Sequence, residues 1–135
     1  MDYVFDACAV IALLNDENGA DTVAGLINQA EMGIDRIFMN GVQVLEVYYD
    51  RIYIKGREYA ETVLDSLYNS QIIILHEISR DMIQETGRFK TSYSMSLGDT
   101  FAAATARNFN AVLVTRDKEM RAPEEAGEFS VLWLK

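Results

Sequence analysis

SLGDTFAAATARNFNAVLVTRD, residues 96–117, is the stretch from which we interpret the whole chain. Its alanine-rich first half predicts a helix, because alanine favours helix and lets a backbone approach a sheet closely. The apolar residues 112–115 then predict a short strand that ends just before Asp117. A helix that precedes its strand and packs on the sheet begins near the edge where that strand ends. We therefore expect Asp99 and Asp117 to lie close together at this edge, where open α/β sheets bind ligands.

The rest of the chain alternates short apolar runs with amphipathic segments. Strands are predicted at residues 3–5, 36–39, 72–75 and 130–134, and helices at residues 7–14, 20–32, 41–54, 58–69 and 80–89. This alternation indicates an α/β fold with a mainly parallel sheet and helices on both of its faces. The chain has 135 residues and contains no linker or repeat. We therefore expect one domain over residues 1–135.

Several local features carry more specific expectations. The β-branched run at residues 72–75 is typical of a strand buried on both faces. Asn40 and Ser79 are expected to cap the helices that follow them. Residues 90–95 are expected to be flexible, and residues 118–128 to be irregular. In the helix at residues 41–54, the side chains expected to face the core are Val42, Leu45, Tyr49 and Ile52.

The composition excludes several classes of protein. Half of the residues are hydrophobic, which excludes a disordered chain. The single cysteine, Cys8, excludes a disulfide framework within the chain and fits a reducing cytoplasm. No apolar run is long enough to span a membrane, and the N-terminus lacks the basic region of a secretory signal. We therefore expect a cytoplasmic protein that does not contact membranes.

The net charge of −9 argues against a protein that a general basic field holds on RNA or DNA. That argument weakens if several carboxylates hold divalent cations. A local basic group, Arg116, Lys118 and Arg121, directly follows the expected site and could bind RNA phosphates. Solvated surface side chains are the alternative interpretation of this group.

Four acids stand at prominent positions: Asp6 after the first strand, Glu46 inside a helix, and Asp99 and Asp117 as described above. Clustered carboxylates repel one another unless cations lie between them. Hard oxygen ligands of this kind suit Mg²⁺ or Mn²⁺. Two such ions can activate a water molecule and stabilise the leaving oxygen of a phosphodiester, without a histidine or serine nucleophile.

Each of these acids also has a structural interpretation. Asp6 could cap the helix that follows it, and Asp117 could be a turn residue. Asp99 could complete an S-x-x-D capping box with Ser96. Glu46 is harder to assign to structure alone, because it shares one side of its helix with two tyrosines. The only histidine, His76, is expected to have a hydrogen-bonded structural role.

Four blocks of sequence resemble the PIN domain family, and more closely the VapC-like toxins of toxin–antitoxin pairs. The blocks are Val4-Phe5-Asp6 before an apolar helix, NGVQVLEVY around Glu46, SLGDTFAAATA around Asp99, and LVTRD ending at Asp117. They follow the order of the family and span most of the chain. The last two blocks together are the more specific.

This resemblance implies a three-layer α/β/α sandwich and an endoribonuclease that depends on Mg²⁺ or Mn²⁺. It implies that Asp6, Glu46 and Asp99 are metal ligands and that Asp117 is a fourth acid. Thr115 would hydrogen-bond to a ligand from outside the metal's own shell. The resemblance also implies an RNA substrate such as tRNA, a cognate antitoxin that covers the active edge, and a homodimer.

The chain departs from the family pattern just after Asp6. The family usually has a serine or threonine within two positions, whereas Ala7 and Cys8 stand here. A PIN-fold binding module without catalysis, acting through RNA or protein contacts, is therefore an open alternative. An enzyme that forms a phosphoaspartate is a second alternative, although such enzymes commonly need an Asp where Cys8 stands.

Overall fold

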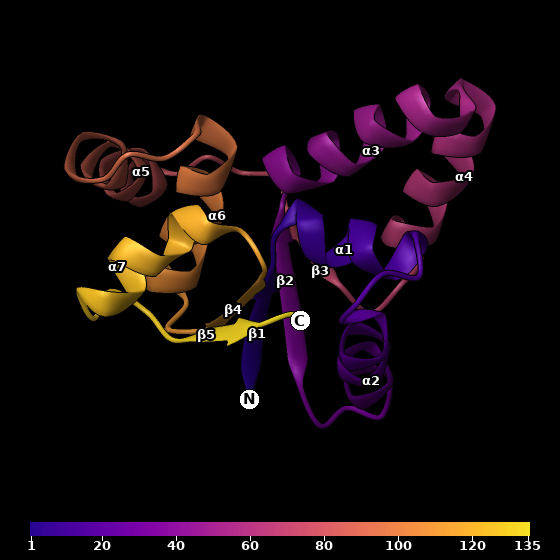
Figure 1. The fold of residues 1–135 in the computed structure, drawn as a ribbon, viewed down its shortest axis with the longest axis horizontal. Helices are drawn as coiled ribbons and strands as arrows, with labels where there is room; N and C mark the ends of the chain where they lie inside the picture. The colour runs from indigo at the N-terminus through magenta and orange to yellow at the C-terminus, as the bar shows by residue number, and fades with distance from the viewer.

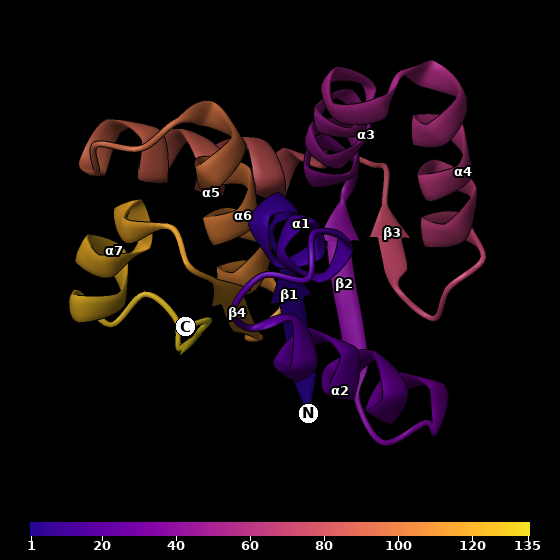
Figure 2. The same cartoon turned by 45° about the vertical axis from the view of Figure 1, so that its right-hand side comes forward.

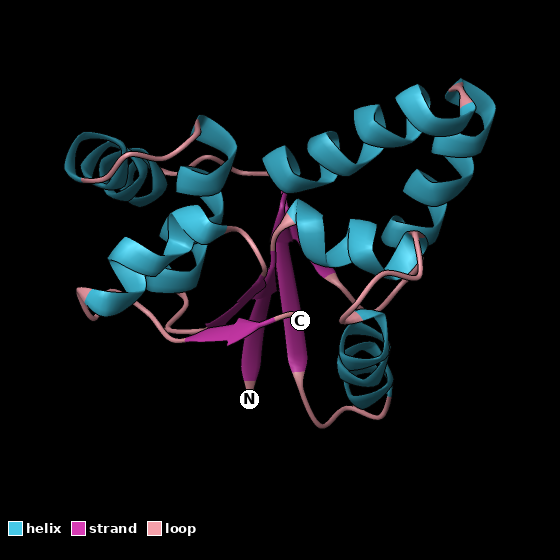
Figure 3. Cartoon of the chain, in the orientation of Figure 1, coloured by secondary structure: helices cyan, strands magenta, loops and turns pink.

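The computed structural model describes residues 1–135 and contains a five-stranded sheet between two layers of helices (Figures 1 and 3). The strands are β1 (Asp2–Phe5), β2 (Arg36–Asn40), β3 (Ile73–Leu75), β4 (Val112–Thr115) and β5 (Val131–Trp133). They are ordered β3-β2-β1-β4-β5, and every neighbouring pair is parallel. The predicted α/β/α sandwich with a parallel sheet is therefore confirmed.

The helices divide between the two faces of the sheet. One face carries α1 (Ala7–Leu14), α2 (Ala20–Glu31), α3 (Gly41–Lys55) and α4 (Arg57–Tyr68). The other carries α5 (Arg80–Ser92) and α6 (Leu97–Asn108). A 3₁₀ turn, η1 (Lys118–Met120), and the short α7 (Arg121–Glu125) follow β4. None of these helices combines the length and apolar composition that crossing a membrane requires.

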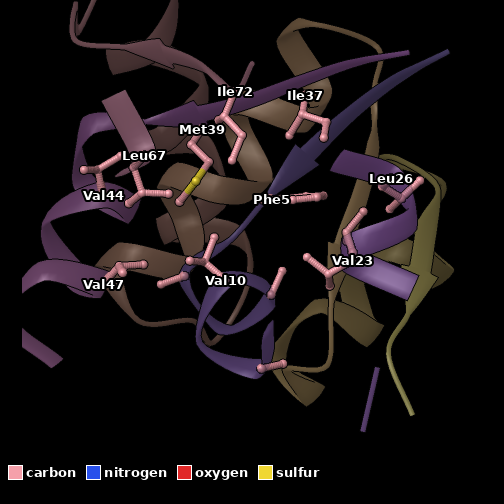
Figure 4. Close-up of a cluster of buried hydrophobic side chains, with 14 of the residues drawn as sticks. Phe5, Val10, Val23, Leu26, Ile37, Met39, Val44, Val47, Leu67 and Ile72 are labelled. Atoms are coloured by element: carbon pink, nitrogen blue, oxygen red, sulfur yellow. The ribbon is translucent and has the colours of Figure 1, made fainter. Parts of the chain in front are cut away.

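Successive residues of the strands serve the two faces alternately, as the pleat of a β-strand requires. Phe5, Ile37 and Met39 pack under α1–α4, in the cluster drawn in Figure 4. Val4 and Phe38 point the other way and pack against α5 and α6. The apolar runs of the sequence therefore supply two hydrophobic cores, which hold both helical layers on one sheet.

The sheet brings helix starts to a common edge, because all strands point the same way (Figure 2). β1 leads through Asp6 directly into α1, and β2 leads through Asn40 into α3. The Asn40 side chain accepts a hydrogen bond from the Gln43 backbone N–H at 3.0 Å, and Ser79 caps α5 in the same way. Both predicted caps are confirmed.

Two expectations about burial are wrong. β3 is an edge strand rather than a strand buried on both faces, and Ile73 is 40% exposed. On α3, Leu45 is 56% exposed, whereas the buried side consists of Gln43, Val44, Val47 and Arg51. Sequence periodicity favoured the apolar side chains here. The polar Gln43 and Arg51 are buried instead because each finds hydrogen-bond partners inside the fold.

The segments expected to be flexible or irregular are partly helical. α5 continues to Ser92, three residues beyond the predicted end. After β4, the Asp117 side chain caps η1 by accepting a hydrogen bond from the Glu119 N–H at 3.0 Å. Pro123 lies in the first turn of α7, where a missing backbone N–H costs no helical hydrogen bond. Local capping therefore orders a segment that appeared irregular from composition.

Candidate metal centre

An open hollow of ≈ 190 Å³ lies at the edge where the parallel strands end. Its lining includes all four acids selected from the sequence, Asp6, Glu46, Asp99 and Asp117. They come from the ends of β1 and β4 and from helices α3 and α6. The expected spatial convergence of these side chains is therefore found in the structure.

Asp6 is 2% exposed and uses both carboxylate oxygens. Oδ1 accepts hydrogen bonds from the Ala9 N–H and the Cys8 thiol, both at 3.0 Å, so Asp6 does cap α1. Oδ2 accepts a hydrogen bond from the Thr115 hydroxyl. Because a carboxylate offers about four lone-pair sites, capping leaves Asp6 able to face the hollow as well.

Thr115 connects the two ends of the site. Its buried hydroxyl donates to Asp6 and accepts a hydrogen bond from the Asp117 N–H at 3.0 Å. Cys8 lies beside this bond, with its sulfur 3.4 Å from the Thr115 oxygen. Burial, and then the Asp6 charge, raise the pKa of Cys8 to about 12. The neutral thiol is thus a weak donor at the place where the sequence lacks a hydroxyl.

The Asp99 side chain does not form the capping box that the sequence allowed, because it makes no hydrogen bond to the Ser96 N–H. Ser96 caps α6 by accepting a hydrogen bond from the Asp99 N–H at 3.3 Å. The return bond to the Ser96 N–H comes from Glu119 Oε1, at 3.2 Å, rather than from Asp99. The Asp99 carboxylate therefore serves the hollow and not its own helix.

Glu119 joins the site although sequence reasoning did not select it. Ligand atoms of Asp99, Asp117 and Glu119 all lie within 4.8 Å of one another, and no other set of three such side chains in the structure is close enough to hold one ion. The available signal was its position two residues after Asp117. That signal was not interpretable without the η1 turn, which brings Glu119 back toward α6. Asp6 and Glu46 line the same hollow but stand outside this grouping.

The electrostatics of the site oppose ionisation of its acids. Burial, followed by the neighbouring Glu119 and Asp117, raises the pKa of Asp99 to about 9. Burial and the charges of Asp6 and Asp117 raise the pKa of Glu46. Burial also raises the pKa of Asp6, against its hydrogen bonds from Cys8 and Thr115. Asp6, Glu46 and Asp99 are therefore difficult to charge together unless positive charge enters the hollow.

The donor set fits a hard divalent cation. It consists of carboxylate oxygens only, with no histidine, and three carboxylates are close enough to share one ion. A larger hollow of ≈ 590 Å³ lies between the end of β3 and α5. Its acids do not approach one another closely enough to form a comparable group.

The three basic residues after β4 are exposed, but two have partners within the chain. Arg116 forms an ion pair with Glu17, and the Arg121 guanidinium lies 4.5 Å above the Trp133 ring. Among them, Lys118 shows no such partner. His76 has the structural role that we expected, since it is stacked on Tyr68 and hydrogen-bonded to its hydroxyl at 3.0 Å.

A family model described as PIN domain matches residues 3–125 of the chain. The protein therefore belongs to the PIN domain family, which confirms the resemblance that its motifs indicated. A comparison with curated proteins gave no match.

Solved structures share the fold. The chain is similar to one in VapBC2 from Rickettsia felis bound to a DNA fragment from its promoter, with a TM-score of 0.74, 20% identity and 100% of both chains covered. It is also similar to one in VapBC-1 from nontypeable Haemophilus influenzae, with a TM-score of 0.69, 15% identity and 98% of both chains covered. A third similar chain is found in VapBC-5 from Mycobacterium tuberculosis, a member of the VapBC family of toxin–antitoxin systems. The TM-score is 0.66, the sequence identity is 15%, and 98% of both chains is covered.

Proposed function

We propose that this protein is an endoribonuclease that uses Mg²⁺ or Mn²⁺ to hydrolyse RNA phosphodiester bonds. The observation that supports this most is the convergence of acids from separate elements on one hollow, with three carboxylates within 4.8 Å. Membership of the PIN domain family supports the same chemistry. A carboxylate site without a histidine, serine or basic lining suits metal-assisted hydrolysis better than nucleophilic catalysis.

In this proposal, Asp6, Glu46, Asp99 and Asp117 hold the divalent cation. Glu119, which has a ligand atom within 4.8 Å of those of Asp99 and Asp117, adds a fifth acid to the site. When bound, the metal supplies an activated water and neutralises negative charge on the phosphodiester. Thr115 keeps the Asp6 carboxylate oriented toward the hollow through its hydroxyl. Lys118, with Arg116 and Arg121 beside it, contacts RNA phosphates at the rim and opposes the repulsion of the net charge.

We further propose that the protein is the toxin of a toxin–antitoxin pair and forms a homodimer, with structured RNA such as tRNA as its substrate. The VapBC structures that share its fold support the pairing. Exposed apolar side chains on α3, of the kind that mark protein contacts, support both associations. They are Leu45, Tyr49, Tyr53 and Ile54.

RNA cleavage by the purified protein tests the enzymatic proposal. We expect cleavage of an RNA pool with Mg²⁺ or Mn²⁺, none with a chelator, and none by Asp6→Ala or Asp99→Ala with either ion. The matched control is Asp65→Ala in α4, whose side chain lies away from the hollow. Cleavage by Asp99→Ala at the wild-type rate would remove this site from the proposed reaction. A wild type that cleaves no RNA with either ion would leave the binding module as the better hypothesis.

A further inference from the structure

Gln43 connects the places where two of the acids enter the hollow. Its side chain in α3 is 1% exposed, and both ends of the amide are hydrogen-bonded. Oε1 accepts from the Ala7 N–H at 2.8 Å, and Nε2 donates to the Gly98 carbonyl at 2.6 Å. The first of these backbone groups belongs to the peptide bond after Asp6, and the second to the peptide bond before Asp99.

Gln43 is itself held in place by α3 and α6. Its backbone N–H donates to Asn40 Oδ1 at 3.0 Å, and Asn40 Nδ2 donates to the Thr105 hydroxyl at 3.0 Å. Asn40 and Thr105 are buried. A continuous chain of buried hydrogen bonds therefore ties the start of α3 to α6 and limits the positions that the Gln43 amide can adopt.

Gly98, which accepts the hydrogen bond from Gln43, also contacts a third acid, Glu46. Glu46 lies one turn after Gln43, and its carboxylate packs directly on the Gly98 backbone. A Cβ atom at position 98 would lie 2.5 Å from Glu46 Oε2 and 2.8 Å from its Cδ. Because the obstructed group is the end of a flexible side chain, an alanine at 98 would displace the carboxylate more readily than the helix.

We propose that Gln43 and Gly98 position Asp6, Glu46 and Asp99 for cation binding, with Gln43 bonded beside two acids and Gly98 leaving space for the third. This inference rests on the proposed function. The Gln43 side chain bonds to backbone groups beside the acids rather than to their carboxylates, so it is a positioning residue. Some groups orient metal ligands from outside the coordination shell. Removing such a group typically lowers metal affinity or activity about 10–100-fold.

The variants Gln43→Met and Gly98→Ala test this proposal. The control is Gly87→Ala in α5, where an added Cβ would meet nothing within 4 Å. The measurements are the Mn²⁺ dissociation constant by calorimetry, kcat and KM for RNA cleavage, and the thermal midpoint without metal. We expect Gln43→Met and Gly98→Ala to weaken Mn²⁺ binding about ten-fold or more and to lower kcat with little change in KM.

The thermal midpoint separates positioning from general stability. Alanine favours helix over glycine, so Gly98→Ala should remain folded near the wild-type midpoint while it loses Mn²⁺ affinity. If Gln43→Met does not fold, Gly98→Ala decides the question by itself. Gly87→Ala should bind Mn²⁺ and cleave RNA like the wild type.

Unchanged Mn²⁺ affinity and kcat in Gly98→Ala, beside an active wild type, would overturn the inference and leave the proposed function standing. A loss confined to the thermal midpoint would overturn it in the same way. A wild type that neither binds Mn²⁺ nor cleaves RNA would remove the proposed function, and this inference with it.

Discussion

Asp99 occupies a position where a helix-capping role and a ligand role compete for one carboxylate. Glu119 takes the capping bond to the Ser96 N–H, so Asp99 remains in the hollow beside Asp117. The consequence is a carboxyl group whose pKa is raised from 3.8 to about 9 by burial and by those neighbours. The folded protein without metal therefore favours a protonated Asp99.

This shift predicts how stability depends on pH when a chelator removes metal. A raised pKa in the folded state stabilises the protein fully below the unfolded pKa near 3.8, and this contribution is lost as the pH rises toward about 9. We expect the free energy of unfolding to fall between about pH 5 and about pH 8. Asp99→Asn cannot ionise and should show a shallower decrease. Urea denaturation at several pH values measures the free energy of unfolding of the wild type and of Asp99→Asn. An equal pH dependence in the two proteins would contradict the raised pKa of Asp99.

Glu119 is predicted to contribute to cation binding. Glu119→Gln keeps the oxygen that accepts from the Ser96 N–H, so α6 should retain its start, but the negative charge is lost. We expect Mn²⁺ affinity to fall about ten-fold, measured by calorimetry. Glu125→Gln, at the exposed end of α7, is the matched control and should bind like the wild type. Equal affinities for the two variants would exclude Glu119 from the site.

At the scale of elements, α6 determines how closely its acid approaches the sheet. Ala102, Ala103, Ala104 and Ala106 are fully buried, so the helix backbone lies close to the strands. We predict that Ala103→Leu overpacks this interface and lowers the free energy of unfolding by about 1–3 kcal/mol. Glu61→Leu on the exposed side of α4 should change it little. Chemical denaturation compares the two, and similar values would contradict close packing of α6.

The elements differ in how well the sequence predicts them. The alternation of apolar runs with amphipathic segments was sufficient for the parallel sheet, since each pattern has its own period. The same reasoning failed on α3, because Gln43 and Arg51 are buried through hydrogen bonds that composition does not reveal. It failed after β4 as well, where the Asp117 cap orders η1 and brings Glu119 to the site. Polar contacts, long-range for α3 and local for η1, account for these errors, and hydrophobic patterning does not reveal them.

At the scale of the whole molecule, the net charge of −9 and an RNA substrate are compatible only if positive charge is added locally. Most of the arginines are already paired with acids of the same chain. The paired arginines are Arg36, Arg51, Arg88, Arg107 and Arg116. A divalent ion among the acids is therefore the direct way for this protein to attract a phosphate. This is the central claim of our account.

Anomalous diffraction from a crystal soaked in Mn²⁺ tests that claim most directly. We predict a peak within about 2–2.5 Å of carboxylate oxygens from Asp99 and Asp117, with Glu119 beside it. The peak should be absent from an Asp99→Asn crystal soaked in the same way. Bound Mn²⁺ elsewhere on the molecule, with none beside Asp99 and Asp117 in the hollow that they line, would contradict the account.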